Sequence, residues 1–100
     1  MATTTKALGR GAFATSSATL YTVPAATTAV VTNIVIANTA GTAGTFILAL
    51  NGTSMATTVA CAANSITTLD LKQVLSATQT ITGLASATTI NYHISGVEIA

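Results

Sequence analysis

The dipeptide Asn51-Gly52 constrains the fold of this chain more than any other short segment, because it stands between two runs of β-forming residues. Asn-Gly favours the tight turn whose twist matches two antiparallel strands, and it is the strongest short-range signal for a β-hairpin. Residues 45–50 alternate large apolar side chains with smaller ones before the dipeptide, and residues 53–59 supply the returning strand. We therefore expect an antiparallel hairpin centred on these two residues.

Further runs of β-forming residues recur along the chain, with turn signals roughly every 8 to 12 residues. In residues 30–38 both alternating sets of positions are largely apolar, which is expected for a central strand covered on both sides. Residues 72–77 are expected to form one helical or 3₁₀ turn, because Leu71, Val74 and Leu75 have helical spacing. The other expected strands are residues 20–23, 65–71, 78–84 and 88–99.

These about seven to eight short strands predict an all-β fold, either an antiparallel β-sandwich or a jelly-roll-like arrangement. A helical bundle is the alternative, because the chain contains 20 Ala residues and Ala favours helices. The 22 Thr residues, with few Leu, Glu, Lys or Gln, make a poor helix sequence. We expect one β-sandwich domain over residues 18–100, preceded by residues 1–17 as an extended or flexible N-terminal arm without periodicity.

Charge is scarce along the whole chain. Five of the 100 residues are charged and the net charge is +1, whereas ordinary domains carry about 25% charged residues. No basic cluster is present, so we expect no nucleic-acid partner. No apolar run approaches the roughly 18 residues of a membrane helix, so we expect no membrane partner either. A near-neutral surface promotes association, and we expect much of this surface to be covered by other protein.

The uncharged strands support the same expectation from strand chemistry. Residues 45–50 have high β-propensity and no charge, so an exposed edge there would be an aggregation hazard. The usual protection, Lys or Glu on edge strands, is nearly absent. Covering such edges with other subunits removes the hazard, which favours a protein that works in an assembly.

Catalytic candidates are few enough to consider one by one. Asp70 and Glu98 would have to form any carboxylate pair, and nothing in the sequence places them together. A Ser followed by Asp70 and His93 could match a hydrolase triad in chain order, but the G-x-S-x-G elbow is missing. Cys61 with His93 could form a nucleophile and base, although Cys61 stands among Ala residues as a small buried thiol would. We expect no enzyme activity.

Ligand sites are equally poorly supported. One His, one Cys and two acidic residues provide no paired spacing for a metal, and no glycine-rich phosphate loop is present, so no metal or cofactor is expected. The single Cys61 excludes a disulfide within one chain. Residues 51–53 formally match a glycosylation acceptor, but the hairpin turn is the simpler interpretation without a secretion signal.

Five runs stand in a distinctive order: LYTVPA, TTAVVTNIVIANTAGTAGTFILALNGT, SITTLDLKQVL, TQTITGLASA and NYHISGVEIA. In this order they resemble a type of small bacteriophage virion protein, over about four fifths of the chain. The typical pattern has a Gly-Lys pair in the turn after YTVPA and a Gly-Asp pair in a later turn. Here Ala26-Thr27 and Thr78-Gln79 replace them, so this chain is less charged than the pattern. The resemblance implies no catalytic residue.

The resemblance implies a small β-sandwich structural protein of the capsid surface, tail or neck. We expect a capsid decoration (cement) protein, made in the host cytoplasm and bound to the outer capsid surface of the virion. Its expected partners are the major capsid protein lattice and copies of itself, as a homotrimer. Lys6, Arg10 and Phe13 of the arm are the expected interface residues. Two alternatives stay open: a tail-tip or fibre module that binds a host receptor, and a neck, collar or tail component.

Overall fold

The computed structural model describes residues 3–100 and, within them, eight strands and no helix. Strands therefore dominate the chain, as the high Thr content and the regular turn signals predict. The strands are β1 (Thr3–Ala12), β2 (Ala18–Thr22), β3 (Thr28–Asn38), β4 (Gly44–Leu50), β5 (Thr53–Cys61), β6 (Ser65–Leu75), β7 (Thr80–Ala85) and β8 (Ile90–Ile99).

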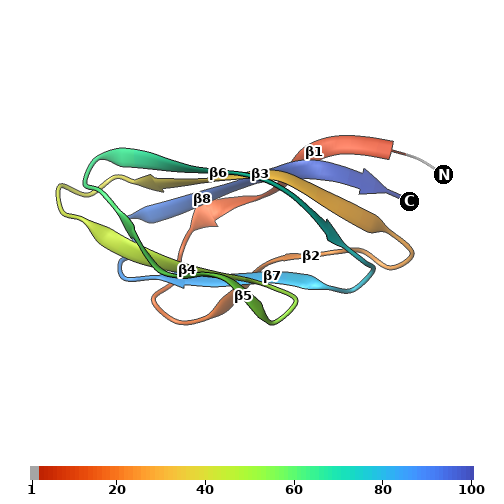
Figure 1. Cartoon of the computed structure of the whole chain (residues 1–100), viewed down its shortest axis with the longest axis horizontal. Coiled ribbons are helices and arrows are strands. Elements are labelled where there is room, and N and C mark those ends of the chain that lie inside the picture. The colour runs from red at the N-terminus through yellow and green to blue at the C-terminus, as the bar shows by residue number, and fades with distance from the viewer. Residues whose placement is uncertain (1–2) are drawn as a thin grey trace.

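The strands form two four-stranded sheets that stack face to face (Figure 1). One sheet has the order β1-β8-β3-β6 and the other β2-β7-β4-β5, and all neighbouring strands are antiparallel. This arrangement confirms the predicted all-β antiparallel sandwich. Only β4 and β5 are neighbours both in sequence and in a sheet. All the remaining connections between consecutive strands cross from one layer to the other.

The predicted hairpin is confirmed as the connection between β4 and β5. Asn51 and Gly52 have φ angles of 48° and 81°, so both central residues of the turn adopt the left-handed region. That geometry is required by the tight hairpin turn that Asn-Gly favours, because its twist matches the twist of the flanking strands. Leu50 and Thr53 are directly paired across it.

Strand β3 contains a bulge that alternation alone could not reveal. The register shifts between Val31 and Asn33 against both neighbouring strands, and Thr32 at this point is exposed. A bulge adds one residue to one strand, so every later side chain changes face. Val31 is therefore buried before the bulge and Ile34 after it, although they differ in parity. β3 is central in its sheet, but its own chain covers only one of its faces.

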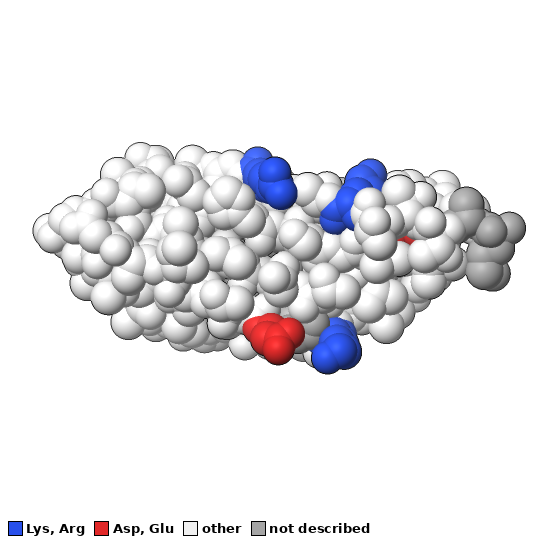
Figure 2. Space-filling view, turned by 90° about the horizontal axis from the view of Figure 1, so that it is seen from above, with Lys and Arg blue, Asp and Glu red and all other residues white. Residues whose placement is uncertain are grey.

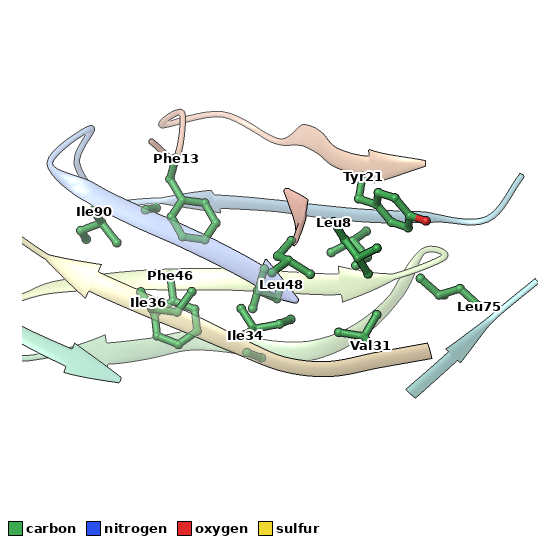
Figure 3. Close-up of a cluster of buried hydrophobic side chains, with 14 of the residues drawn as sticks. Leu8, Phe13, Tyr21, Val31, Ile34, Ile36, Phe46, Leu48, Leu75 and Ile90 are labelled. Carbon is green, nitrogen blue, oxygen red and sulfur yellow. The ribbon is translucent and has the colours of Figure 1, made fainter. Parts of the chain in front are cut away.

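The inner faces of the two sheets meet in one apolar core (Figure 3). Side chains from both layers interdigitate there, which removes them from water and supplies the main stabilisation of the sandwich. The largest fully buried side chains are Phe13, Phe46, Ile34, Ile36, Leu48, Ile81, Ile90, Ile94, Val23, Val31 and Cys61.

The helical turn predicted for residues 72–77 is wrong. Strand β6 continues to Leu75, with Val30 opposite Val74 and Ala29 opposite Leu75. Exposed Val74 and buried Leu75 alternate as strand residues do. The backbone of β3 offers hydrogen-bond partners along the whole of β6, and this tertiary pairing outweighs a local helical spacing of three apolar residues.

Close packing of β3 on β8 predicts that a methyl group at Gly96 is not tolerated. A Cβ atom at this position would clash with the backbone carbonyl of Val30 and lie 2.9 Å from the Leu8 side chain. We expect Gly96→Ala to lower the free energy of unfolding by about 1–3 kcal/mol, since overpacking against backbone forces a shift. Urea denaturation followed by circular dichroism measures it.

Gly41→Ala is the matched control, because a Cβ at Gly41 would have no heavy atom within 4 Å. We expect this variant to stay within about 0.5 kcal/mol of the parent chain. Equal stability of the two variants would contradict the close approach of β3 and β8.

Candidate interaction surfaces

The predicted N-terminal arm lies within the sandwich as its edge strand β1. Residues 3–12 pair with β8 along the whole strand, from Thr3 opposite Ile99 to Ala12 opposite Asn91. Residues 3–12 are therefore extended and belong to the sandwich that the sequence places in residues 18–100. Lys6 and Arg10 are both exposed on this strand, so both are accessible to a neighbouring molecule.

Phe13 is placed differently from the other two predicted interface residues. Its side chain is 1% exposed, and its ring centroid lies 5.2 Å from that of Tyr92 and 6.5 Å from that of Phe46. Its amide also donates a hydrogen bond to the Ile90 carbonyl, at 2.9 Å. Phe13 therefore fills the core of its own chain and offers no surface to a partner. Its apolar bulk pointed to burial, but the sequence does not say against which molecule.

A polar cluster joins the two sheets near the start of β1. The hydroxyl of Tyr21, on β2, donates a hydrogen bond to Glu98 Oε2 on β8, and Lys6 Nζ lies 3.3 Å from Glu98 Oε1. The hydrogen bond from Tyr21 lowers the pKa of Glu98, with Lys6 adding to the effect against partial desolvation. Burial, followed by the bond to the Glu98 carboxylate, raises the pKa of Tyr21. We call these three residues the Tyr21 clasp.

The structure does not bring the catalytic candidates together. Asp70 lies opposite Asn33 on edge strand β6, whereas Glu98 lies on β8, with β3 between the two strands. Cys61 is buried in the core at the end of β5, and His93 is exposed on a strand of the other sheet. No pairing of a nucleophile with a base is formed by these side chains.

Two kinds of feature are absent from residues 3–100, which the structure describes. No group of three or more His, Cys, Asp or Glu side chains gathers there as a metal site would require. No helix in this part of the chain has the length and apolar character needed to cross a membrane.

All five charged residues lie in one of the two sheets. Lys6 and Arg10 are on β1, Asp70 and Lys72 on β6, and Glu98 on β8, so the sheet β2-β7-β4-β5 holds no charged residue. The order of strands, which the sequence does not reveal, produces this segregation. On the outside of the uncharged sheet, half-buried side chains define what we call the charge-free face: Thr45, Ile47, Ala49, Thr80, Thr82 and Leu84.

The chain matches no protein-family model and no curated protein sequence. Among solved structures, a protein of the disulfide-linked pili of Bacillus endospore appendages is similar, with a TM-score of 0.55 and 16% identity over 99% of this chain and 87% of that one. The nucleoplasmin-like N-terminal domain of Drosophila FKBP39 has a TM-score of 0.53 and 9% identity over 98% and 91% of the two chains. A pentameric capsid protein from metagenomic phage sequences has a TM-score of 0.37 and 10% identity over 90% of this chain and 60% of that one. This TM-score is too low to support an inference about this chain. These likenesses show the fold alone.

The buried position of Phe13 predicts that Phe13→Ala destabilises the isolated chain. Truncating a fully buried Phe leaves a cavity, so we expect the free energy of unfolding to fall by about 3–5 kcal/mol. Urea denaturation measures the change. An unchanged midpoint, combined with weaker association, would instead restore the interface role for this side chain.

The Tyr21 clasp predicts a stability that depends on pH. Because the pKa of Glu98 is lower in the folded than in the unfolded chain, its contribution is present above the unfolded pKa and is lost as the pH falls through the folded pKa. Tyr21→Phe removes the first cause of the shift, so we expect the stability difference between parent and variant to shrink as pH falls from about 6 to about 3. Urea denaturation across that range measures it, and Glu98→Gln should abolish the dependence due to this site. A difference that is constant with pH would contradict the clasp.

Proposed function

We propose that this chain is a structural protein of a virion and that it decorates the outer surface of a capsid as a cement protein. The observation that carries the proposal is the charge-free face, because a complete outer sheet surface without charge is unusual for a protein that stays free in water. The ordered resemblance to small bacteriophage virion proteins supports the same role.

The chemistry of the charge-free face suits attachment to a protein lattice. Thr45, Thr80 and Thr82 present hydroxyl groups that can donate and accept hydrogen bonds, directly or through water. Such short side chains lose little rotamer freedom on docking. Many weak contacts on a symmetric shell would add up through multivalency, so no single contact needs to be strong.

The composition of the edge strands of the uncharged sheet also supports the proposal. Edge strands β2 and β5 contain no Lys, Arg, Asp or Glu, although charges are the common protection of a free edge. Register shifts interrupt both strands, which limits their pairing in solution. Lys6 and Arg10, exposed on β1 of the other sheet, remain our proposed contacts with a neighbouring copy of this chain.

A receptor-binding tail-tip or fibre module is the second candidate, and the aromatic residues count against it. Phe13, Phe46 and Tyr21 are buried, and Tyr92 is half-buried against the core. None of these rings is free to stack on a sugar or a base. A neck, collar or tail component remains a further alternative, and the number of copies per particle distinguishes it from a capsid decoration protein.

Copy number per particle tests the assignment to the capsid. We expect particles produced from the genome that encodes this chain to contain it in hundreds of copies, in proportion to the major capsid protein. Quantitative mass spectrometry of purified particles measures the ratio. A few dozen copies or fewer would assign the chain to the neck or tail and overturn the decoration role.

A charge placed on the charge-free face tests the attachment surface. Thr82→Lys puts an ammonium group in the middle of this face. We expect it to reduce binding to undecorated particles by roughly tenfold or more, because docking would then desolvate an unpaired charge. Cosedimentation measures the binding.

Thr88→Lys is the matched control, because it makes the same change at an exposed position in the turn between β7 and β8. We expect it to bind as the parent chain does. Equal binding of Thr82→Lys and Thr88→Lys would show that another surface makes the attachment.

A further inference from the structure

The outer face of the sheet β1-β8-β3-β6 carries apolar side chains toward both ends of its central strand β3. On β3, the half-buried Val30, Val35 and Ala37 point away from the core, because their neighbours along the strand are the buried residues. An antiparallel sheet that meets water normally presents polar side chains on that side. The apolar outer face of this sheet, defined by its clearest members, comprises Val30, Val35, Ala37, Ile66, Val74 and Val97.

Strand pairing gathers these side chains into two groups, which are separated along the strands by the row of Asn33, Ser95 and Asp70. Val30 lies opposite Val74 on β6 and opposite Val97 on β8, and Ala37 lies opposite Ile66. Ile66 and Val74 are 68% and 64% exposed, and they are the exposed large hydrophobic side chains of the described residues. Exposed apolar side chains rimmed by polar groups mark an interaction site.

Charge is confined to the two rims of this face. Arg10 lies on edge strand β1 opposite His93, and Asp70 lies on edge strand β6 opposite Asn33. Figure 2 looks onto this face and shows most of the coloured side chains along its two long sides, with only a small red area between them toward one end. Within residues 3–100, Arg10 and Asp70 take part in no ion pair.

The rims select one symmetric arrangement of two copies. A two-fold axis that lies in the interface and runs along the strands turns the β1 rim of one copy onto the β6 rim of the other. Arg10 lies in the same row across the sheet as Val35 and Thr68, so this axis places Thr68 of the second copy opposite Arg10. Asp70 of the second copy is two residues along β6 from that position. Lys72 lies farther from that row. An axis across the strands would instead place the two β1 rims, each with the basic residues Lys6 and Arg10, against each other, which is repulsive.

The dimensions of the face are sufficient for a stable pair. The outer face seen in Figure 2 spans the longest and the shortest extents of the molecule, 45 and 18 Å, because the two sheets stack along the third axis. Its area is therefore about the 800 Å² that each partner buries in a standard interface. Sheets that pack face to face lie about 10 Å apart. Ile66 would then oppose the small Ala12 of the second copy, since the two residues share a row.

We propose that two copies of this chain pack face to face through the apolar outer face, about a two-fold axis parallel to the strands, with Arg10 of each copy paired with Asp70 of the other. This two-fold pair replaces the homotrimer that the sequence suggests. It does not rest on the proposed capsid attachment, which uses the charge-free face on the opposite side of the sandwich.

Sedimentation equilibrium over a range of protein concentrations tests the proposal. We expect the parent chain to form a dimer, and we expect Ile66→Lys and Val74→Lys each to raise its Kd by roughly tenfold or more, because each buries an unpaired charge. Both positions are exposed in the single chain, so folding should persist, and urea denaturation checks it. Thr88→Lys carries the same added charge outside the face and should leave the dimer unchanged.

A charge exchange tests the axis. Arg10→Asp alone and Asp70→Arg alone should each weaken the dimer, since like charges then meet, whereas the double variant should restore it. A parent chain that is monomeric, trimeric or larger would overturn the proposal, as would a dimer insensitive to Ile66→Lys. A double variant no tighter than either single variant would overturn the axis. If the parent chain is a monomer and its Ile66→Lys variant no longer binds particles, the apolar outer face is the surface that contacts the capsid. If Thr82→Lys binds particles as the parent chain does, only the proposed capsid role is overturned, and the dimer is unaffected.

Discussion

The pairing of β3 with β8 on one side and with β6 on the other is the interaction on which the rest of the structure depends. Every residue of β3 from Ala29 to Asn38, except Thr32 at the bulge, is paired with a residue on each of the two neighbouring strands. This pairing decides which side chains enter the core and which remain outside. It also brings Gly96 against the β3 backbone, where no side chain fits.

The same pairing organises the few charges. Because β8 and β3 occupy the middle of their sheet, the strands with most of the charged residues, β1 and β6, form its edges. Edge charges protect free strands from unwanted pairing, and only this sheet has them. The outer faces of the two layers therefore differ: one carries charged residues on its edge strands, and the other combines Thr hydroxyl groups with apolar side chains and has no charge.

The sequence predicts the local features and misses those that depend on distant contacts. Asn51-Gly52 encodes its turn directly, because the conformation of two residues is a local property. The bulge at Thr32 has no such signature, since it arises from the fit of β3 to two partners at once. Phe13 illustrates the same limit at the candidate site. Its hydrophobicity predicts burial, but only the fold shows that Phe46 and Tyr92 of the same chain surround it.

The position of β8 has a consequence for biosynthesis. The last of the eight strands lies between β1 and β3, so the first and third strands are separated until it arrives. The β4–β5 hairpin can form as the chain emerges from a ribosome, whereas the charged sheet cannot close before residue 99 has been released. A chain cut short by early termination lacks the strand that joins its edges. If copies assemble through that sheet as proposed, only subunits translated as far as β8 can join, and incomplete copies are excluded.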